Sequence, residues 1–418
     1  MPSSENVLHQ ISVPGRGAPT ATTRGEALMR AALSTLRRSD QRGWARLYLD
    51  GLLDLRERRT ISRIAHRAGA GQVGQSLHHF ISKSPWDWER MRAELARFLH
   101  GELAPPAWVV DSVVIPKAGE HSVGVDVSFV PELGRRISHQ RAVGLWFASE
   151  HGSVPVHWRL MLPERWTDDA ALRYKTGVPE TAEPDLLEAG LGLVHDVGSE
   201  WGIPPRPVVL DGRGYAAERL LHRLARTGTP YVARIAGDAR FGALHPAAVR
   251  YGNGAASARR LVDLVKGLRT PTGWRAGDGT VRTSLALGTP VAPLYGNDGS
   301  TARPLTLVGE WRSEDDRDPA LWVSNLPGIP ARSVLRMGHL LDTVRPPAPD
   351  SLGASALHDF EGRSFPGWHH HATLVSVACA VRALSAGTGP DSHGARSSPA
   401  RSAEAGGTAW FRPGPARC

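Results

Sequence analysis

Two aspartates lie in sequence runs that are otherwise apolar and largely β-branched. Asp111 interrupts the run from Ala107 to Ile115, and Asp211 ends the run Pro207-Val-Val-Leu-Asp211. Burying an ionised carboxylate without a partner costs on the order of several kcal/mol, so each aspartate requires an explanation. A bound metal ion supplies one. For Asp111, a place on the solvent face of the strand or a pairing with an arginine is the alternative.

The position of Asp211 favours the metal. It stands at the carboxyl end of its strand, directly before Gly212, where the ligand-binding groups of α/β sheets emerge. Carboxylates from neighbouring strands can share hard divalent cations such as Mg²⁺ or Mn²⁺, which prefer oxygen ligands. Two such ions about 4 Å apart stabilise both the attacking and the leaving oxygen of an in-line phosphodiester displacement. A third carboxylate is needed to complete the pair of metal sites.

The elements around the aspartates predict that their two strands are neighbours. Extended segments are expected at 107–115, 141–148 and 154–161, and their spacing suits an antiparallel meander. A helix, a strand, a helix and a strand follow, at 184–197, 207–211, 216–225 and 230–235. Three antiparallel strands followed by α, β, α, β is the order of an RNase H-like sheet. The predicted fold class is therefore α/β, an RNase H-like mixed sheet flanked by helices.

The rest of the chain divides by composition and by the period of its apolar residues. In order, we expect a flexible arm (1–24), an all-helical domain (25–105), the first part of the core (106–236), a β-rich insertion (237–325), the closing part of the core with helices at 331–344 and 373–384 (326–385), and a disordered tail (386–418). Thr60 and Ser84 are predicted to cap two helices of the all-helical domain. This domain suits recognition of DNA ends, although a lid or packing role fits the same pattern.

Composition limits the classes of function. Lys and Arg total 50 against 41 Asp and Glu, a formal net charge of +9 that favours a polyanionic partner. A general enrichment in arginine, unrelated to function, would give the same net charge. The two cysteines can form neither a disulfide framework nor a cysteine zinc site, which fits a reducing cytosol. Because the sequence has no signal-like apolar segment and no run long enough for a membrane span, we expect a cytoplasmic protein with no membrane partner.

Several blocks, in the same order along the chain, resemble the insertion-sequence DDE transposases, from about residue 40 to residue 385. The blocks around the first aspartate are Trp108-Val-Val-Asp111, Pro116-Lys-Ala-Gly119 and Ser122-Val-Gly-Val125. The most specific block comes late in the chain and reads Asp359-Phe-Glu-Gly-Arg-Ser-Phe-Pro-Gly-Trp-His-His-His371. Further matching blocks begin at Gln75, Leu160 and Trp322.

The resemblance implies a function and a site. It implies a bacterial, nucleoid-associated DNA transposase that uses Mg²⁺ or Mn²⁺ to cut at insertion-sequence ends and to join 3′-hydroxyls to target double-stranded DNA, with a homodimer on the paired ends. Asp111 falls on the first acid of the family and Asp211 on the second. Glu361 is the predicted third acid, with Asp342 as the competing choice. Ser112 departs from many relatives, which carry an acidic residue at that point.

Four further residues are predicted to contact DNA. Lys117 and Arg363 are candidates for gripping the scissile phosphate, since both are cationic and Arg363 can bind a phosphate in a bidentate way. His369 and His371 are expected near DNA phosphate or the catalytic carboxylates, or as the start of the last helix. The histidine cluster does not predict a zinc site, because adjacent histidines on a helix point to different faces and no cysteine is nearby.

Two other functions fit the same residues. An RNase H-like nuclease would cut DNA without joining strands. A transposase-derived DNA-binding protein would keep the fold and the affinity for DNA without catalysis. An unrelated hydrolase is disfavoured, because the sequence contains neither a Gly-x-Ser-x-Gly elbow nor a His-Glu-x-x-His motif.

Overall fold

The computed structural model describes residues 21–54, 58–68, 72–181, 183, 185–249, 254–275, 280–294, 303–345 and 352–386. The predicted arm up to residue 20 and the predicted tail beyond residue 386 lie outside this range, as do the two prolines after Arg345. Among the helices in the described ranges, none is long and apolar enough to span a membrane.

Five helices form the N-terminal part of the described chain, as expected. They are α1 (Ala21–Ser34), α2 (Ser39–Asp54), α3 (Ile61–Arg67), α4 (Gln72–Ser82) and α5 (Trp88–Leu103). Thr60 caps α3 as predicted, because its hydroxyl accepts the Arg63 N–H. The predicted cap at Ser84 is wrong: α5 starts later, and the Asp87 carboxylate caps it by accepting the Arg90 N–H at 3.0 Å.

The predicted antiparallel meander is present. It consists of β1 (Ala107–Pro116), β3 (Arg135–Ser149) and β4 (Gly152–Leu160), with β3 paired to both neighbours. The first half of β3 also pairs with β2 (Asp126–Val130), a strand that the sequence pattern did not predict, and a short 3-10 turn η1 (Pro131–Leu133) joins them. Opposite Asp111, in the register of β1 with β3, lies Gly144.

The second part of the core follows the predicted order. Helices α6 (Glu164–Asp168), α7 (Ala170–Thr176) and α8 (Leu186–His195) and a π-helical turn η2 (Asp196–Glu200) precede β5 (Val208–Asp211), α9 (Ala217–Thr227) and β6 (Tyr231–Ile235). Strand β5 is parallel to β1 on one side and to β6 on the other. The strand order β4-β3-β1-β5-β6 confirms the RNase H-like α/β class.

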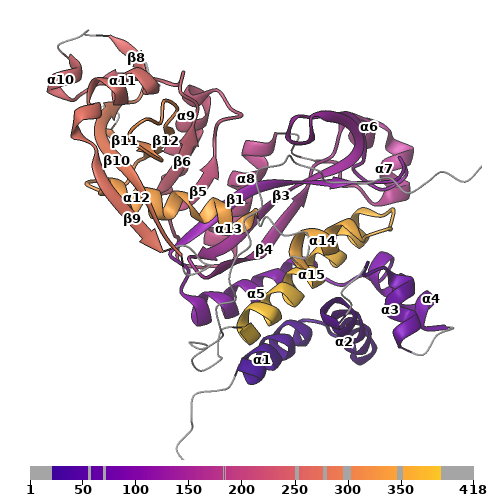
Figure 1. The fold of residues 1–418 in the computed structure, drawn as a ribbon. Helices are drawn as coiled ribbons and strands as arrows, with labels where there is room; N and C mark the ends of the chain where they lie inside the picture. Colours follow the sequence, from indigo (N-terminus) through magenta and orange to yellow (C-terminus); the bar gives the residue numbers. More distant parts are fainter. Residues whose placement is uncertain are drawn as a thin grey trace, which may run out of the picture.

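The β-rich insertion continues the same sheet. It consists of β7 (Arg240–Ala243), α10 (Pro246–Val249), β8 (Ala255–Ser257), α11 (Ala258–Leu264), η3 (Lys266–Leu268), β9 (Thr270–Arg275), β10 (Val281–Ala292), β11 (Leu305–Trp311) and β12 (Ala320–Ser324). Strand β12 pairs antiparallel with β6, which joins the insertion to the core as one sheet (Figure 1). A β-rich insertion was expected from the sequence, but no sequence pattern indicated which strand of the core it would join.

The closing helices differ from the prediction in two ways. The helix expected at 331–344 is two helices, α12 (Ala331–Gly338) and α13 (Leu340–Val344), separated at His339. After α14 (Leu352–His358), the last helix α15 (Phe365–Ala386) begins eight residues before the predicted start. Helix α15 is buried over most of its length and contacts α1, α2, α4, α5 and β4, so it joins the N-terminal helices to the sheet (Figure 1).

Candidate active site

Asp111 and Asp211 lie side by side, as the sequence predicted. Val110 of β1 pairs with Leu210 of β5 in parallel register, so the next residue of each strand is an aspartate at the same edge. Both side chains are nearly buried, with 7% of the Asp111 side chain and 12% of the Asp211 side chain exposed. Neighbouring residues of a strand point to opposite faces, so Asp111 rather than Ser112 shares a face with Asp211.

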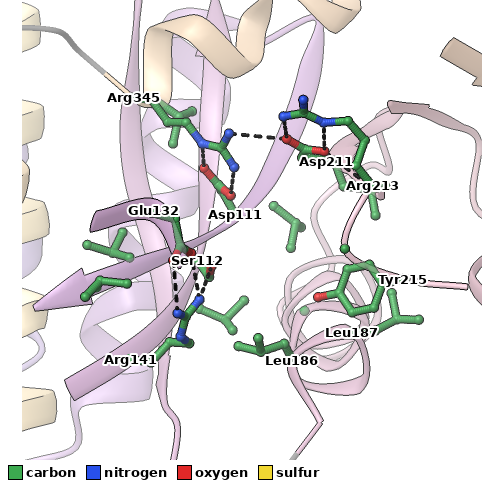
Figure 2. A pocket seen from close by; sticks show the side chains of 18 of the residues that line it. Asp111, Ser112, Glu132, Arg141, Leu186, Leu187, Asp211, Arg213, Tyr215 and Arg345 are labelled. Atoms are coloured by element: carbon green, nitrogen blue, oxygen red, sulfur yellow. Dashed lines mark hydrogen bonds and ion pairs between the residues drawn. The ribbon is translucent and has the colours of Figure 1, made fainter. Parts of the chain in front are cut away.

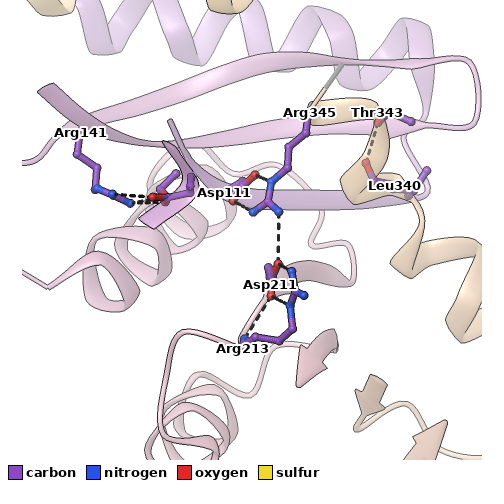
Figure 3. Close-up of polar contacts among 9 residues, drawn as sticks. Asp111, Arg141, Asp211, Arg213, Leu340, Thr343 and Arg345 are labelled. Atoms are coloured by element: carbon purple, nitrogen blue, oxygen red, sulfur yellow. Dashed lines mark hydrogen bonds and ion pairs between the residues drawn. The ribbon is translucent and has the colours of Figure 1, made fainter. Parts of the chain in front are cut away.

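The guanidinium group of Arg345 lies between the two carboxylates (Figure 3). Its Nη2 donates to Asp111 Oδ1 at 2.6 Å and its Nε donates to Asp111 Oδ2, so both oxygens of Asp111 accept from it. Its Nη1 lies 3.3 Å from Asp211 Oδ2. The alternative that Asp111 pairs with an arginine is therefore confirmed in this structure.

The chain places Arg345 at this point because helix α13 ends there. Arg345 precedes Pro346, and the residue before a proline is disfavoured in the α-helical region of backbone space. Arg345 accordingly has φ −106° and ψ 65° and forms the C-terminal cap of α13. Helix α13 itself contacts β1 and β5, so its end lies over the edge that carries the aspartates.

A second arginine holds Asp211 from the other side. Gly212 follows Asp211, and a Cβ atom there would lie 2.9 Å from the Arg234 carbonyl oxygen, so only glycine allows the chain to turn this close to β6. The turn brings the side chain of Arg213 back onto Asp211, with Nη2 at 2.7 Å from Oδ2 and Nε at 2.9 Å from Oδ1. Burial favours a higher pKa for Asp211, but the hydrogen bonds from Arg213 and the charges of both arginines outweigh it and lower the pKa to about 2.

The pair borders a pocket of about 840 Å³ (Figure 2). Valine and leucine side chains of β1, β3, β5 and α8 line its apolar part. Its polar part includes the Glu132–Arg141 ion pair, with a 3.1 Å separation of Oε1 and Nη1, and the ring of Tyr215. Burial, together with the nearby carboxylates of Asp185 and Asp111, raises the pKa of the Tyr215 hydroxyl, so this group stays protonated at neutral pH.

Glu361 does not lie with the pair. Its side chain is 61% exposed and its Oε1 lies 3.6 Å from Nη2 of Arg58. The preceding residue, Phe360, accepts a hydrogen bond of 2.7 Å from Lys117 Nζ. Lys117 follows the end of β1, and six residues of extended strand from Asp111 to Lys117 span about 20 Å. The structure therefore puts this block nearer the far end of β1, and the role of Glu361 as third acid stays a prediction.

Asp342 does not contact the pair either. It lies on α13, 66% exposed, with its Oδ2 at 3.3 Å from Nδ1 of His339, and it lines a second cavity of about 820 Å³ beside the insertion. Across the part of the chain that the structure describes, no group of three or more Asp, Glu, His or Cys side chains is arranged to hold a metal ion. Within the described ranges, the aspartate pair is thus brought together without a third acid.

The histidine cluster is part of the core. His369 and His371 are 4% and 0% exposed, so the prediction that they contact DNA phosphate is wrong for this structure. The Tyr48 hydroxyl donates to Nδ1 of His371, whose Nε2–H donates to the Ala356 carbonyl. These contacts bind α15 to α2 and α14. Burial lowers the pKa of His371 to about 4, which keeps its ring neutral and suits this pattern.

Arg92 has a similar role for α5. It is fully buried, and its guanidinium donates to Thr373 Oγ1 at 2.7 Å, to the Trp158 carbonyl at 2.9 Å and to the His369 carbonyl at 3.1 Å. These bonds connect α5 to β4 and α15. Of the predicted DNA contacts, Lys117 is partly buried and donates to main-chain carbonyls, whereas Arg363 is exposed.

The sequence analysis did not identify Arg345, Arg213 or Arg92. A signal existed for Arg213, because an arginine two residues after an aspartate and next to a glycine can fold back in a turn. Arg345 and Arg92 carry no local signal, since they are two among 50 Lys and Arg residues and their partners lie far away in the chain.

One family model and one solved transposase complex are similar to this chain. No curated protein matches the chain. A piggyBac transposase synaptic complex with hairpin DNA, solved by cryo-electron microscopy, is similar at 11% identity and a TM-score of 0.40, covering 88% of this chain and 72% of that one. The family model of the DDE superfamily endonucleases matches residues 32–286, which include both aspartates but neither Arg345 nor Glu361. Since this match covers more than half of the 418 residues, the protein belongs to the DDE superfamily endonuclease family.

Proposed function

We propose that this protein is a DNA transposase that cuts phosphodiester bonds at the ends of an insertion sequence and joins the 3′-hydroxyls to target DNA. One observation carries the proposal: Asp111 and Asp211, from neighbouring parallel strands of an endonuclease-family core, present their carboxylates close enough for one guanidinium to contact both. A pair of nearly buried carboxylates at one edge of a sheet has no packing value of its own, and it suits a site for a cation.

The donor set fits a divalent metal in its chemistry. Asp111 and Asp211 supply carboxylate oxygens, which are the ligands that Mg²⁺ and Mn²⁺ prefer. When bound, such an ion neutralises charge that develops on phosphate oxygens and lowers the pKa of a coordinated water or hydroxyl. The protein's own share is to hold the two carboxylates in fixed positions, through the strands and through Arg213. Glu361 is proposed as the third acid from the family block alone, with Asp342 as its competitor.

We propose that DNA binds over the pocket that Asp111 and Asp211 line. Arg363 is exposed and available for a phosphate, and the excess of positive charge favours the approach of DNA. Lys117 is proposed as a residue that supports the block 358–361 through its carbonyl contacts and reaches DNA only if these break. We also propose that two copies of the protein act together on the paired ends, and that they do so in a bacterial nucleoid.

The test is a cleavage and joining assay with Mg²⁺, a linear DNA carrying the ends that flank the gene, and a supercoiled target. Asp111→Asn and Asp211→Asn are expected to reduce both cutting and joining by at least about 1000-fold while affinity for the ends changes less than about threefold. Asp263→Asn, an exposed aspartate of α11 paired with Arg259, is the control and should cut normally. If the Asp111 and Asp211 variants cut as well as the unmodified protein, the proposal is wrong.

The same assay separates the remaining choices. Loss of cutting in Glu361→Gln with normal cutting in Asp342→Asn supports Glu361 as third acid, and the reverse supports Asp342. Cutting without any joined product indicates a nuclease without strand transfer.

A specific observation favours one second candidate, a transposase-derived DNA-binding protein without catalysis. Arg345 is bound to both aspartates, and among the described residues no third acid lies with them. Binding to the ends without any cutting in Mg²⁺ or Mn²⁺ would support this candidate.

A further inference from the structure

The charges at the aspartate pair cancel. Two carboxylates face two guanidinium groups: Arg345 contacts both aspartates and Arg213 contacts Asp211. Among the described residues that line this pocket, the other charged groups are Glu132 and Arg141, and they form a pair of their own. A divalent cation is attracted to a site by uncompensated negative charge, and this arrangement offers none.

The oxygen atoms of Asp111 are also occupied. Arg345 donates to both of them, in a bidentate contact that is stronger than ordinary neutral hydrogen bonds. A metal ion that used Asp111 as a ligand would need at least one of these lone-pair positions. The guanidinium lies between the two carboxylates, where a cation bridging them would have to lie (Figure 3).

The Arg345 guanidinium can nevertheless dissociate from the two carboxylates. Its side chain is 49% exposed, whereas the two aspartates are nearly buried, so the guanidinium can exchange the carboxylates for water. A DNA phosphate offers a better exchange, since a guanidinium binds phosphate oxygens in the same bidentate way. Arg345 would then move its charge from the carboxylates to the bound DNA.

We propose that Arg345 is an internal counter-ion that takes the place of the divalent cation at Asp111 and Asp211 in the DNA-free protein, and that DNA binding releases the pair for the metal. The inference rests on the proposed function, because it takes this pair as the metal site. It adds a coupling: DNA and metal each favour the binding of the other, because both require Arg345 to leave the carboxylates.

Titration of Mn²⁺ into the full chain without DNA, followed by the electron paramagnetic resonance signal of free Mn²⁺, tests the first part. Arg345→Met is expected to bind Mn²⁺ about 10- to 100-fold more tightly than the unmodified protein, which is the effect of removing one charge-assisted contact. The matched control is Arg336→Met, on α12, which breaks the ion pair of Arg336 with Glu150 in the turn between β3 and β4 and should not change the affinity. Adding Asp111→Asn to Arg345→Met should abolish the gain.

The second part is tested by repeating the titration with a saturating DNA fragment that carries one end. DNA should tighten Mn²⁺ binding at least about tenfold in the unmodified protein and much less in Arg345→Met. Arg345→Gln, which keeps a polar side chain, gives the same comparison if Arg345→Met does not fold. Equal Mn²⁺ affinities for the unmodified protein and the folded Arg345 variants would overturn the inference.

These outcomes are independent of the cleavage test. A protein that cuts DNA through Asp111 and Asp211, yet binds Mn²⁺ equally with and without Arg345, keeps the proposed function and loses this inference. A protein that never cuts DNA, but gains Mn²⁺ affinity on loss of Arg345, keeps the counter-ion role and loses the proposed function.

Discussion

Replacement of Arg92 by methionine or lysine tests how the N-terminal helices are attached to the sheet. Arg92 lies on α5, and its described side-chain hydrogen-bond partners are neutral groups of β4 and α15 rather than carboxylates. Burial lowers the pKa of its guanidinium to about 9, although the charge of Glu89 partly opposes the change. The group is still protonated at pH 7, so the fold contains a buried charge whose described hydrogen-bond partners are all neutral and which the charge of Glu89 helps to stabilise.

The expected order of stability follows from two opposing magnitudes. The lowered pKa corresponds to about 5 kcal/mol of penalty on the charged form, and methionine removes this penalty. Methionine also leaves the Trp158 carbonyl, His369 Nδ1 and His157 Nδ1 without the arginine, at about 1–3 kcal/mol for each buried acceptor that stays unpaired. The His369 carbonyl keeps the Thr373 hydroxyl as a donor at 2.7 Å. The three unpaired acceptors cost about 3–9 kcal/mol in total, which nearly offsets the removed penalty, so we expect Arg92→Met to lower the free energy of unfolding by about 1 kcal/mol.

Arg92→Lys is expected to lower the free energy of unfolding more than Arg92→Met does, although lysine preserves the charge. An ammonium group retains the cost of burial but cannot reach acceptors on two different elements with the fixed geometry of a guanidinium. We therefore expect Arg92→Lys to cost about 3–5 kcal/mol.

Urea unfolding at pH 7, followed by fluorescence of the 13 tryptophans, measures both values. The control is Arg97→Met, which removes an exposed pair with Glu94 on the same helix and should cost less than about 1 kcal/mol. If Arg92→Lys is as stable as the unmodified protein, or more stable than Arg92→Met, the geometry of the guanidinium is not what attaches α5.

Two further predictions concern the sheet and the insertion. Burial acts to lower the pKa of His339, but its contacts with Asp342 and Glu310 raise it to about 9, so the stability that protonated His339 contributes is complete below about pH 6.5 and is lost as the pH rises through about 9. The free energy of unfolding should therefore fall by up to about 3 kcal/mol more between pH 6 and pH 10 in the unmodified protein than in His339→Gln, and equal slopes would refute this. Gly144→Ala should cost about 1–3 kcal/mol in urea unfolding, because a Cβ atom there would lie 2.6 Å from the Trp146 ring, whereas Gly119→Ala, with no neighbour within 4 Å, should be nearly neutral.

The strands of the core could be predicted because their signals are local. The β-branched run around Asp111 and the short apolar run before Asp211 each specify a buried strand, and the element order of an RNase H-like sheet then makes the two strands neighbours. Strand β2 escaped prediction because it is only five residues long and four of these are half-buried or exposed, so the segment carries a weak signal for a buried strand. The split of the closing helix at His339 escaped for a different reason, since the residue is turned toward Glu310, a partner 29 positions away.

Local sequence signals do not show which third group lies with Asp111 and Asp211. The expectation of a third acid came from a resemblance between blocks, and the block that carries Glu361 is held by Lys117 and Arg58 rather than by the aspartate pair. The group that contacts the pair is Arg345. Two buried carboxylates require a cation, and this guanidinium supplies the positive charge that the sequence analysis expected from a metal ion. A buried carboxylate thus predicts a positive partner reliably, but whether that partner is a metal ion or a guanidinium depends on where one short helix ends. In this chain that end is set by the proline after Arg345, so the nature of the centre depends on a residue with no charge and no ligand atom of its own.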